Sequence, residues 1–116
     1  MMKYVNLTTK TIRIMLESSS GQPKFLEIPP SGQTAIVTET RREWKVLEDG
    51  VPVTEIALHE IEGLPDPVPG VIYIVNGYVA QAIGSYRDDV VAPDIGKSAI
   101  KINGAIWASR GWRVYA

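Results

Sequence analysis

The chain has 116 residues, of which 45% are hydrophobic and 22% are charged, and its formal net charge is −1. This composition predicts one soluble globular domain over residues 1–116 and argues against a dedicated nucleic-acid binder. The absence of cysteine excludes disulfides and thiolate chemistry. The N-terminus lacks a signal-peptide pattern, and no apolar run approaches the roughly 20 residues of a membrane span. We therefore expect a cytoplasmic protein without membrane contact.

Charge is distributed unevenly along the sequence. Seven acidic residues and a single base, Lys45, lie between Glu43 and Asp66, whereas four bases and no acid follow from Lys97 onward. Such a dipole would steer an anion toward the C-terminal part. The simpler alternative is a mixed, solvated surface.

The first third of the chain has the pattern of short strands. Residues 4–7, 11–16, 25–28 and 33–40 are rich in β-prone side chains, and 11–16 alternate between two faces. Residues 18–23 have the composition of a loop. The segment 29–32 predicts a turn, since proline presets φ and glycine accepts a positive φ.

The middle of the chain predicts a hairpin. Residues 44–47 and 51–61 flank Asp49 and Gly50, a dipeptide typical of a tight turn, and Pro52 favours an edge position. The proline-rich segment 64–70 follows, and it lacks the donors of a central strand. We expect it to connect the two halves of the fold.

Residues 71–75 form the strongest strand pattern, and we expect this strand to be central. Residues 76–84 allow two interpretations. Asn76 and Gly77 resemble a hairpin turn, whereas Asn76 as N-cap and Gly84 as C-terminal stop would frame a short helix. We favour the helix, because two alanines and a glutamine make a poor strand.

The C-terminal part predicts a second hairpin and a last strand. Residues 99–102 and 105–109 flank Asn103 and Gly104, and 111–115 alternate again. The chain as a whole predicts an α+β, mainly β domain with about eight short strands and one short helix around 76–84. The strands would form a twisted antiparallel or mixed sheet, or an open barrel.

Six segments are distinctive: VNLTTKTI, IPPSGQTA, PGVIYIVNGYVAQAI, RDDVVAPD, SAI and RGWRV, which together span nearly the whole chain. These segments resemble a family of small phage and prophage proteins. Asn76-Gly77 and Thr9-Lys10 depart from the family pattern, which tends to have a serine with a larger residue and a Pro-His pair there. The resemblance implies a mobile-element origin and a location in the host cytoplasm, but no particular reaction.

The polar segment 85–98 is the best candidate for a site. We expect it to bind a nucleotide-like anion, with arginine and lysine contacting phosphate and a tryptophan stacking on a base. The predicted ligand-binding residues are Arg87, Asp88, Asp89, Asp94, Lys97, Arg110 and Trp112. The alternative is structural: Arg87 pairs with an aspartate, and another aspartate caps a turn.

Other chemistries have less support. Gly96-Lys97-Ser98 lacks the upstream glycine of a phosphate-binding loop. A single histidine, His59, removes the usual transition-metal sets. We therefore predict no catalytic residues, no metal and no cofactor. Two alternatives remain: a decoy that blocks a host enzyme through the acidic segment, and a Mg²⁺-dependent hydrolase of small phosphorylated molecules using the aspartates. A homo-oligomer is compatible with the sequence.

Overall fold

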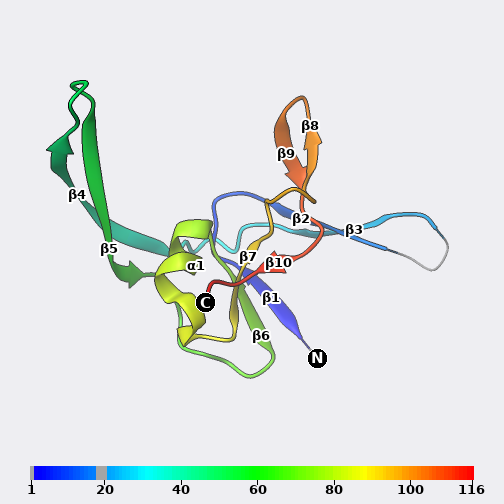
Figure 1. The fold of residues 1–116 in the computed structure, drawn as a ribbon. Helices are drawn as coiled ribbons and strands as arrows, with labels where there is room; N and C mark the ends of the chain where they lie inside the picture. The colour runs from blue at the N-terminus through cyan, green and yellow to red at the C-terminus, as the bar shows by residue number, and fades with distance from the viewer. Residues whose placement is uncertain (1, 18–20) are drawn as a thin grey trace.

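A computed structural model describes residues 2–17 and 21–116 of the chain, which are mainly β (Figure 1). In this part the chain forms ten strands, one α-helix and one 3₁₀ turn. The strands are β1 Lys3–Asn6, β2 Ile12–Leu16, β3 Lys24–Ile28, β4 Ile36–Val46, β5 Pro52–Glu62, β6 Val71–Ile74, β7 Val90–Pro93, β8 Ile100–Ile102, β9 Ala105–Ala108 and β10 Trp112–Arg113. The helix α1 is Gly77–Ile83, and the 3₁₀ turn η1 is Gly84–Tyr86.

A four-stranded mixed sheet forms the centre of the molecule. Its strand order is β1-β6-β7-β10, with β1, β6 and β7 parallel and β10 antiparallel to β7. The predicted central strand is therefore confirmed as β6. The carboxyl ends of the three parallel strands meet at one edge of this sheet, which is where the fold gathers the loops that follow them.

Helix α1 connects β6 to β7, and its start is fixed locally. The Oδ1 atom of Asn76 accepts a hydrogen bond of 2.9 Å from the backbone N–H of Val79, which satisfies a donor that the helix itself leaves open. Gly84 follows the last turn with a φ of 56°. The helix interpretation of residues 76–84 is confirmed, and the hairpin alternative is wrong.

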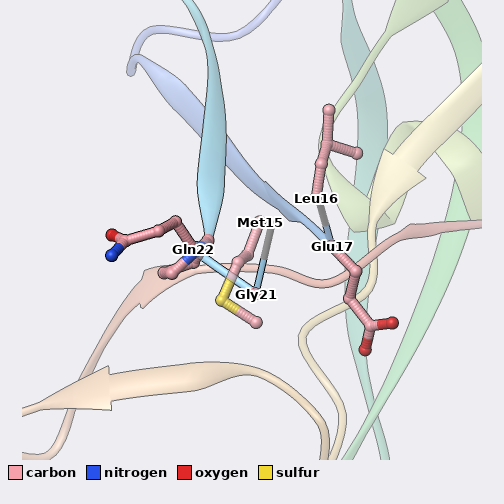
Figure 2. A pocket seen from close by; sticks show the side chains of 6 residues that line it. Met15, Leu16, Glu17, Gly21 and Gln22 are labelled. Atoms are coloured by element: carbon pink, nitrogen blue, oxygen red, sulfur yellow. The ribbon is translucent and has the colours of Figure 1, made fainter. Parts of the chain in front are cut away.

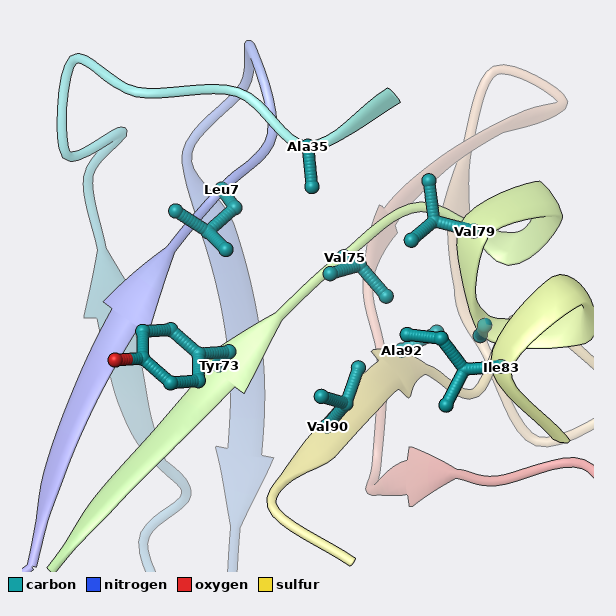
Figure 3. Packing of buried hydrophobic residues seen from close by; sticks show 9 residues of the cluster. Leu7, Ala35, Tyr73, Val75, Val79, Ile83, Val90 and Ala92 are labelled. Atoms are coloured by element: carbon teal, nitrogen blue, oxygen red, sulfur yellow. The ribbon is translucent and has the colours of Figure 1, made fainter. Parts of the chain in front are cut away.

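The buried core is small and lies where α1 meets the central sheet (Figure 3). Val79 and Ile83 of the helix face Val90 and Ala92 of β7 and Val75, which directly follows β6. Leu7 and Ala35 close the cluster from the loops after β1 and before β4. The core thus fixes the carboxyl ends of β1, β6 and β7 relative to one another.

Three two-stranded ribbons project from this centre (Figure 1): β2–β3, β4–β5 and β8–β9. The first two are inserted between β1 and β6, and the third between β7 and β10. The radius of gyration is 17.1 Å, whereas a compact domain of this length has about 13 Å. The molecule is therefore extended, with principal extents of 58 × 36 × 26 Å.

The predicted fold class is confirmed as α+β and mainly β, and none of the described sheets closes into a barrel. The expected number of about eight strands was too low. Residues 90–93 form β7, a strand that the sequence did not predict, because β6 and β10 pair with them. Residues 36–46, expected to contribute to two strands, form a single strand. Part of the predicted loop, residues 18–20, lies outside the described residues. No described helix has the length and apolar character needed to cross a membrane.

Candidate functional site

The structure divides the predicted site between the two ends of β7. Arg87, Asp88 and Asp89 precede this strand, and Asp94 follows it. Asp89 and Asp94 are thus separated along an extended chain by about 16 Å, since a strand rises roughly 3.3 Å per residue. The predicted carboxylates therefore do not form one cluster.

Arg87 and Asp89 form an ion pair that is largely withdrawn from solvent. Nε and Nη2 of Arg87 each lie 2.7 Å from one carboxylate oxygen of Asp89, and the two side chains are 16% and 13% exposed. Nη2 also donates to the carbonyl oxygen of Pro65 at 3.1 Å. The hydrogen bonds from Arg87 hold the pKa of Asp89 below its ordinary value. The structural alternative predicted that Arg87 pairs with an aspartate. The bond to Pro65, which was not predicted, connects the 64–70 segment to the start of β7.

Asp94 pairs with a residue that the sequence did not single out, Arg113. Its Oδ1 atom lies 2.6 Å from Nη2 of Arg113 and accepts a hydrogen bond of 3.1 Å from the N–H of Gly96. Both interactions lower the pKa of Asp94, and the hydrogen bond from Arg113 is the larger cause. Nη1 of Arg113 donates to the Tyr115 hydroxyl at 3.3 Å. The pair orients the Arg113 guanidinium.

The remaining predicted residues are exposed or bonded to other groups. Lys97 and Asp88 are exposed, and Nε of Arg110 donates to the carbonyl of Ser98 at 3.0 Å. The Trp112 indole donates to the Tyr4 hydroxyl at 3.1 Å, and the two ring centroids are 5.3 Å apart. Trp112 thus contacts Tyr4 through both its indole N–H and its ring.

A pocket of about 340 Å³ opens at the carboxyl ends of β1, β6 and β7, and we call it the strand-end pocket. It combines apolar walls, several hydroxyl groups and two cationic side chains, Lys10 and Arg113. Its lining residues are Thr8, Thr9, Lys10, Ile12, Thr34, Val75, Asn76, Gly77, Pro93, Ile95, Arg113 and Tyr115. In open α/β sheets, ligands bind outside the carboxyl ends of the parallel strands, and β1, β6 and β7 are parallel.

Asn6 holds the wall of the pocket in place. Its side chain is buried, and its Nδ2 donates to the carbonyls of Lys10 at 2.8 Å and Ile28 at 2.9 Å. Its Oδ1 accepts from the N–H and the hydroxyl of Thr8 at 2.9 and 2.7 Å. These four bonds shape the loop that presents Thr8, Thr9 and Lys10. An asparagine at the end of a strand and two residues before a threonine is the signal for this Asx turn.

A second hollow of about 310 Å³ lies where β2 ends (Figure 2). Met15 and Leu16 supply aliphatic walls, and Glu17 is its one charged lining residue among those described. A carboxylate repels an anion, so this hollow suits an anionic ligand less well than the strand-end pocket does. Within residues 2–17 and 21–116, no three metal-ligating side chains come together to hold a metal ion. The side chain of His59 lies outside the described set.

Comparison with known proteins identifies no similar protein. No family model matches the chain, and neither the curated proteins nor the solved structures contain a match. The class of site is therefore defined by geometry: an apolar pocket with two cations and several hydroxyls at the open edge of a mixed sheet.

Proposed function

We propose that this chain is a non-catalytic binding protein that takes a small organic anion, nucleotide-like in size, into the strand-end pocket. The observation that carries the proposal is the joint presence of Lys10, Arg113 and apolar side chains in one pocket. Small-molecule sites are mostly apolar clefts of about 300–1,000 Å³ with a few placed polar groups. At about 340 Å³ the pocket admits one small molecule.

The cations select the charge of the ligand. Arg113 is held by Asp94 at 2.6 Å and by the Tyr115 hydroxyl at 3.3 Å, so its orientation is set before a ligand arrives. Lys10 is carried by the loop that Asn6 fixes. A preorganised cation loses little conformational freedom when it binds a phosphate or carboxylate.

The segments that carry the phage-protein resemblance converge on this pocket. Ten of the lining residues come from VNLTTKTI, IPPSGQTA, PGVIYIVNGYVAQAI, RDDVVAPD and RGWRV. This supports the proposal that the pocket serves an accessory protein of a phage or other mobile element, acting in the host cytoplasm. Among the seven residues predicted from the sequence, Asp94 belongs to this arrangement through its contact with Arg113.

A thermal-shift series tests the proposal. Nucleotides, cyclic nucleotides, ADP-ribose derivatives and inorganic phosphate are added in turn, and the melting temperature is followed by intrinsic tryptophan fluorescence. A ligand at a hundred times its Kd stabilises by about 2.7 kcal/mol, which raises the melting temperature of a domain of this size by about 4 °C or more.

Two lysine variants make this experiment specific. We expect Lys10→Gln to abolish the shift and Lys97→Gln to leave it unchanged, because Lys10 lines the pocket and Lys97 does not. Neither lysine has an ion-pair partner among the described residues, so both variants should fold. An equal shift in both variants would place the ligand elsewhere.

The decoy function has one specific observation in its favour. Most of the acidic segment from Glu43 to Asp66 lies on the projecting β4–β5 ribbon, where a host protein could reach it (Figure 1). Its test is purification of the tagged chain from host cells, with Glu43→Lys/Glu48→Lys as the matched bait. A host enzyme that the unmodified chain retains and inhibits, and the charge-reversed bait releases, would support it.

The hydrolase alternative lacks a comparable arrangement. It needs carboxylates that share a Mg²⁺ ion, whereas Asp89 is paired with Arg87 and Asp94 with Arg113. It stays a prediction, which turnover of a phosphorylated ligand in the presence of Mg²⁺ would test.

A further inference from the structure

The β4–β5 ribbon leaves the body of the molecule as a long arm, which we define as residues 36–62. Val37 and Ile61 pack against the core at its base, and the rest extends outward (Figure 1). A two-stranded ribbon on its own is marginally stable in water. An arm of two 11-residue strands is therefore a structure that gains stability from a partner.

Apolar side chains are exposed along the arm. Trp44 is 56% exposed and Val46 is 55% exposed, although both are large hydrophobic residues. The exposed set on the arm is Ile36, Trp44, Val46, Leu47, Val51 and Ile56. Large apolar side chains exposed on a projecting element are typical of an interaction site.

A second surface with exposed apolar side chains lies across the central sheet from the arm (Figure 1). The β2–β3 and β8–β9 ribbons join there through hydrogen bonds between Ser109 and the backbone of Arg13 and Met15, at 2.9 and 2.8 Å. The Phe25 and Trp107 rings also meet edge to face. We call this surface the hairpin lobe, residues 12–17, 21–28 and 96–111. Its exposed apolar residues are Leu16, Phe25, Ile102, Ile106 and Trp107.

The two surfaces have opposite charge. The arm carries seven acidic and three basic residues, whereas the hairpin lobe carries five basic and two acidic residues. Within the arm, Arg41 and Arg42 are already paired with Glu39 and Glu55. The acidic residues that remain, such as Glu43 and Glu48, give the arm its negative charge. Complementary charge aligns two surfaces and raises their association rate.

The exposed area indicates how much surface is to be covered. The chain exposes 8198 Å², whereas a compact monomer of 12.8 kDa exposes about 6,300 Å². A standard interface buries about 800 Å² on each partner. A chain that uses both its arm and its lobe would bury about 1,600 Å², which is close to the excess.

We infer that copies of this chain associate head to tail, with the acidic arm of one copy lying on the basic hairpin lobe of the next. The contact is heterologous, so it generates a closed ring or an open filament. The second copy is favoured over a host protein as the occupant of the arm because the matching charge and apolar surface are present on the chain itself. The inference is independent of the ligand proposed above.

Charge reversal on each surface separately tests the inference. The arm variant is Glu43→Lys/Glu48→Lys and the lobe variant is Lys97→Glu/Lys101→Glu, all exposed residues. Sedimentation velocity at low ionic strength should show an oligomer for the unmodified chain and a monomer for each variant. Raising the salt concentration should shift the unmodified chain toward monomer. Asp88→Lys and Lys3→Glu, exposed and outside both surfaces, serve as controls that leave the oligomer intact.

Mixing the two variants gives the most specific outcome. The arm variant keeps an intact lobe and the lobe variant keeps an intact arm, so an equimolar mixture should form a dimer that grows no further. An arm-to-arm contact predicts instead that the lobe variant stays oligomeric. The inference would be overturned if the unmodified chain were monomeric at every concentration, or if the mixture remained monomeric. A monomeric mixture would favour a host protein as the partner of the arm.

Discussion

The guanidinium of Arg87 meets the carboxylate of Asp89 through two contacts of 2.7 Å each, and both side chains are more than four-fifths buried. These residues are two apart in the sequence, and their pairing connects the start of β7 to the carbonyl of Pro65. The pair is thus part of the framework that supports the strand-end pocket, at the end of β7 away from it.

Removing Arg87 should therefore destabilise the fold. Arg87→Met leaves the Asp89 carboxylate poorly solvated and without its partner, and we expect the free energy of unfolding to fall by about 2–3 kcal/mol. Urea titration followed by tryptophan fluorescence measures this loss. Asp88→Asn, at the exposed neighbouring position, should change stability by less than about 0.5 kcal/mol. Equal losses in the two variants would contradict a structural role for the pair.

The same pair predicts a pH dependence of stability. The pKa of Asp89 is lowered in the folded state, first by its hydrogen bonds with Arg87. Its contribution is therefore fully present above the unfolded-state pKa of about 4 and is lost as the pH falls through the lower folded-state pKa. The stability difference between the unmodified chain and Asp89→Asn should be largest near neutral pH and shrink below about pH 4. A difference that stays constant down to about pH 2 would show that the carboxylate charge is not involved.

Gly63 lies at the base of the arm and should not tolerate a side chain. Its φ is 83°, and a Cβ there would overlap the backbone carbonyl oxygen of Thr34. We expect Gly63→Ala to cost about 3 kcal/mol or more, since both the φ strain and the clash must be relieved. Gly50 at the arm tip has a φ of 90° but open space around it, so Gly50→Ala should cost about 1 kcal/mol. Thermal unfolding of the two variants separates the clash from the φ strain.

Asn6 connects stability with binding. Asn6→Leu removes four hydrogen bonds and leaves the carbonyl of Ile28 and the N–H of Thr8 without their partner, which should cost about 2–4 kcal/mol. Once a ligand has been found by thermal shift, its affinity should also fall, because the loop that carries Lys10 is released. Calorimetric titration below the melting temperature of the variant measures this. Unchanged affinity would show that this loop is not part of the binding site.

Features set by neighbouring residues could be predicted from the sequence. The helix follows from the Asn76 cap, and the β8–β9 turn follows from Asn103 and Gly104, which adopt φ values of 53° and 80° as a tight hairpin turn requires. Strand β7 could not be predicted in this way. It has four residues and ends in proline, so it is a strand because of the β6 and β10 backbones on either side of it.

The candidate site could not be predicted from the sequence for the same reason. The segment 85–98 concentrates charge, but the fold places its two ends at opposite ends of β7. Asp94 pairs with Arg113, and the β8–β9 ribbon lies between these two residues in the sequence. The strand-end pocket takes residues from five separate stretches of chain. Such a convergence depends on the order of strands in the sheet, which no local pattern encodes.

The insertion of two ribbons between β1 and β6 also affects how the chain folds. Lys3 pairs in register with Val71, so β1 cannot find its neighbour until more than half of the polypeptide has left the ribosome. Hairpins close within microseconds, whereas contacts between distant segments form slowly. We therefore expect the ribbons to form early and the parallel sheet late in synthesis, so that the pocket is the last part of the molecule to be completed.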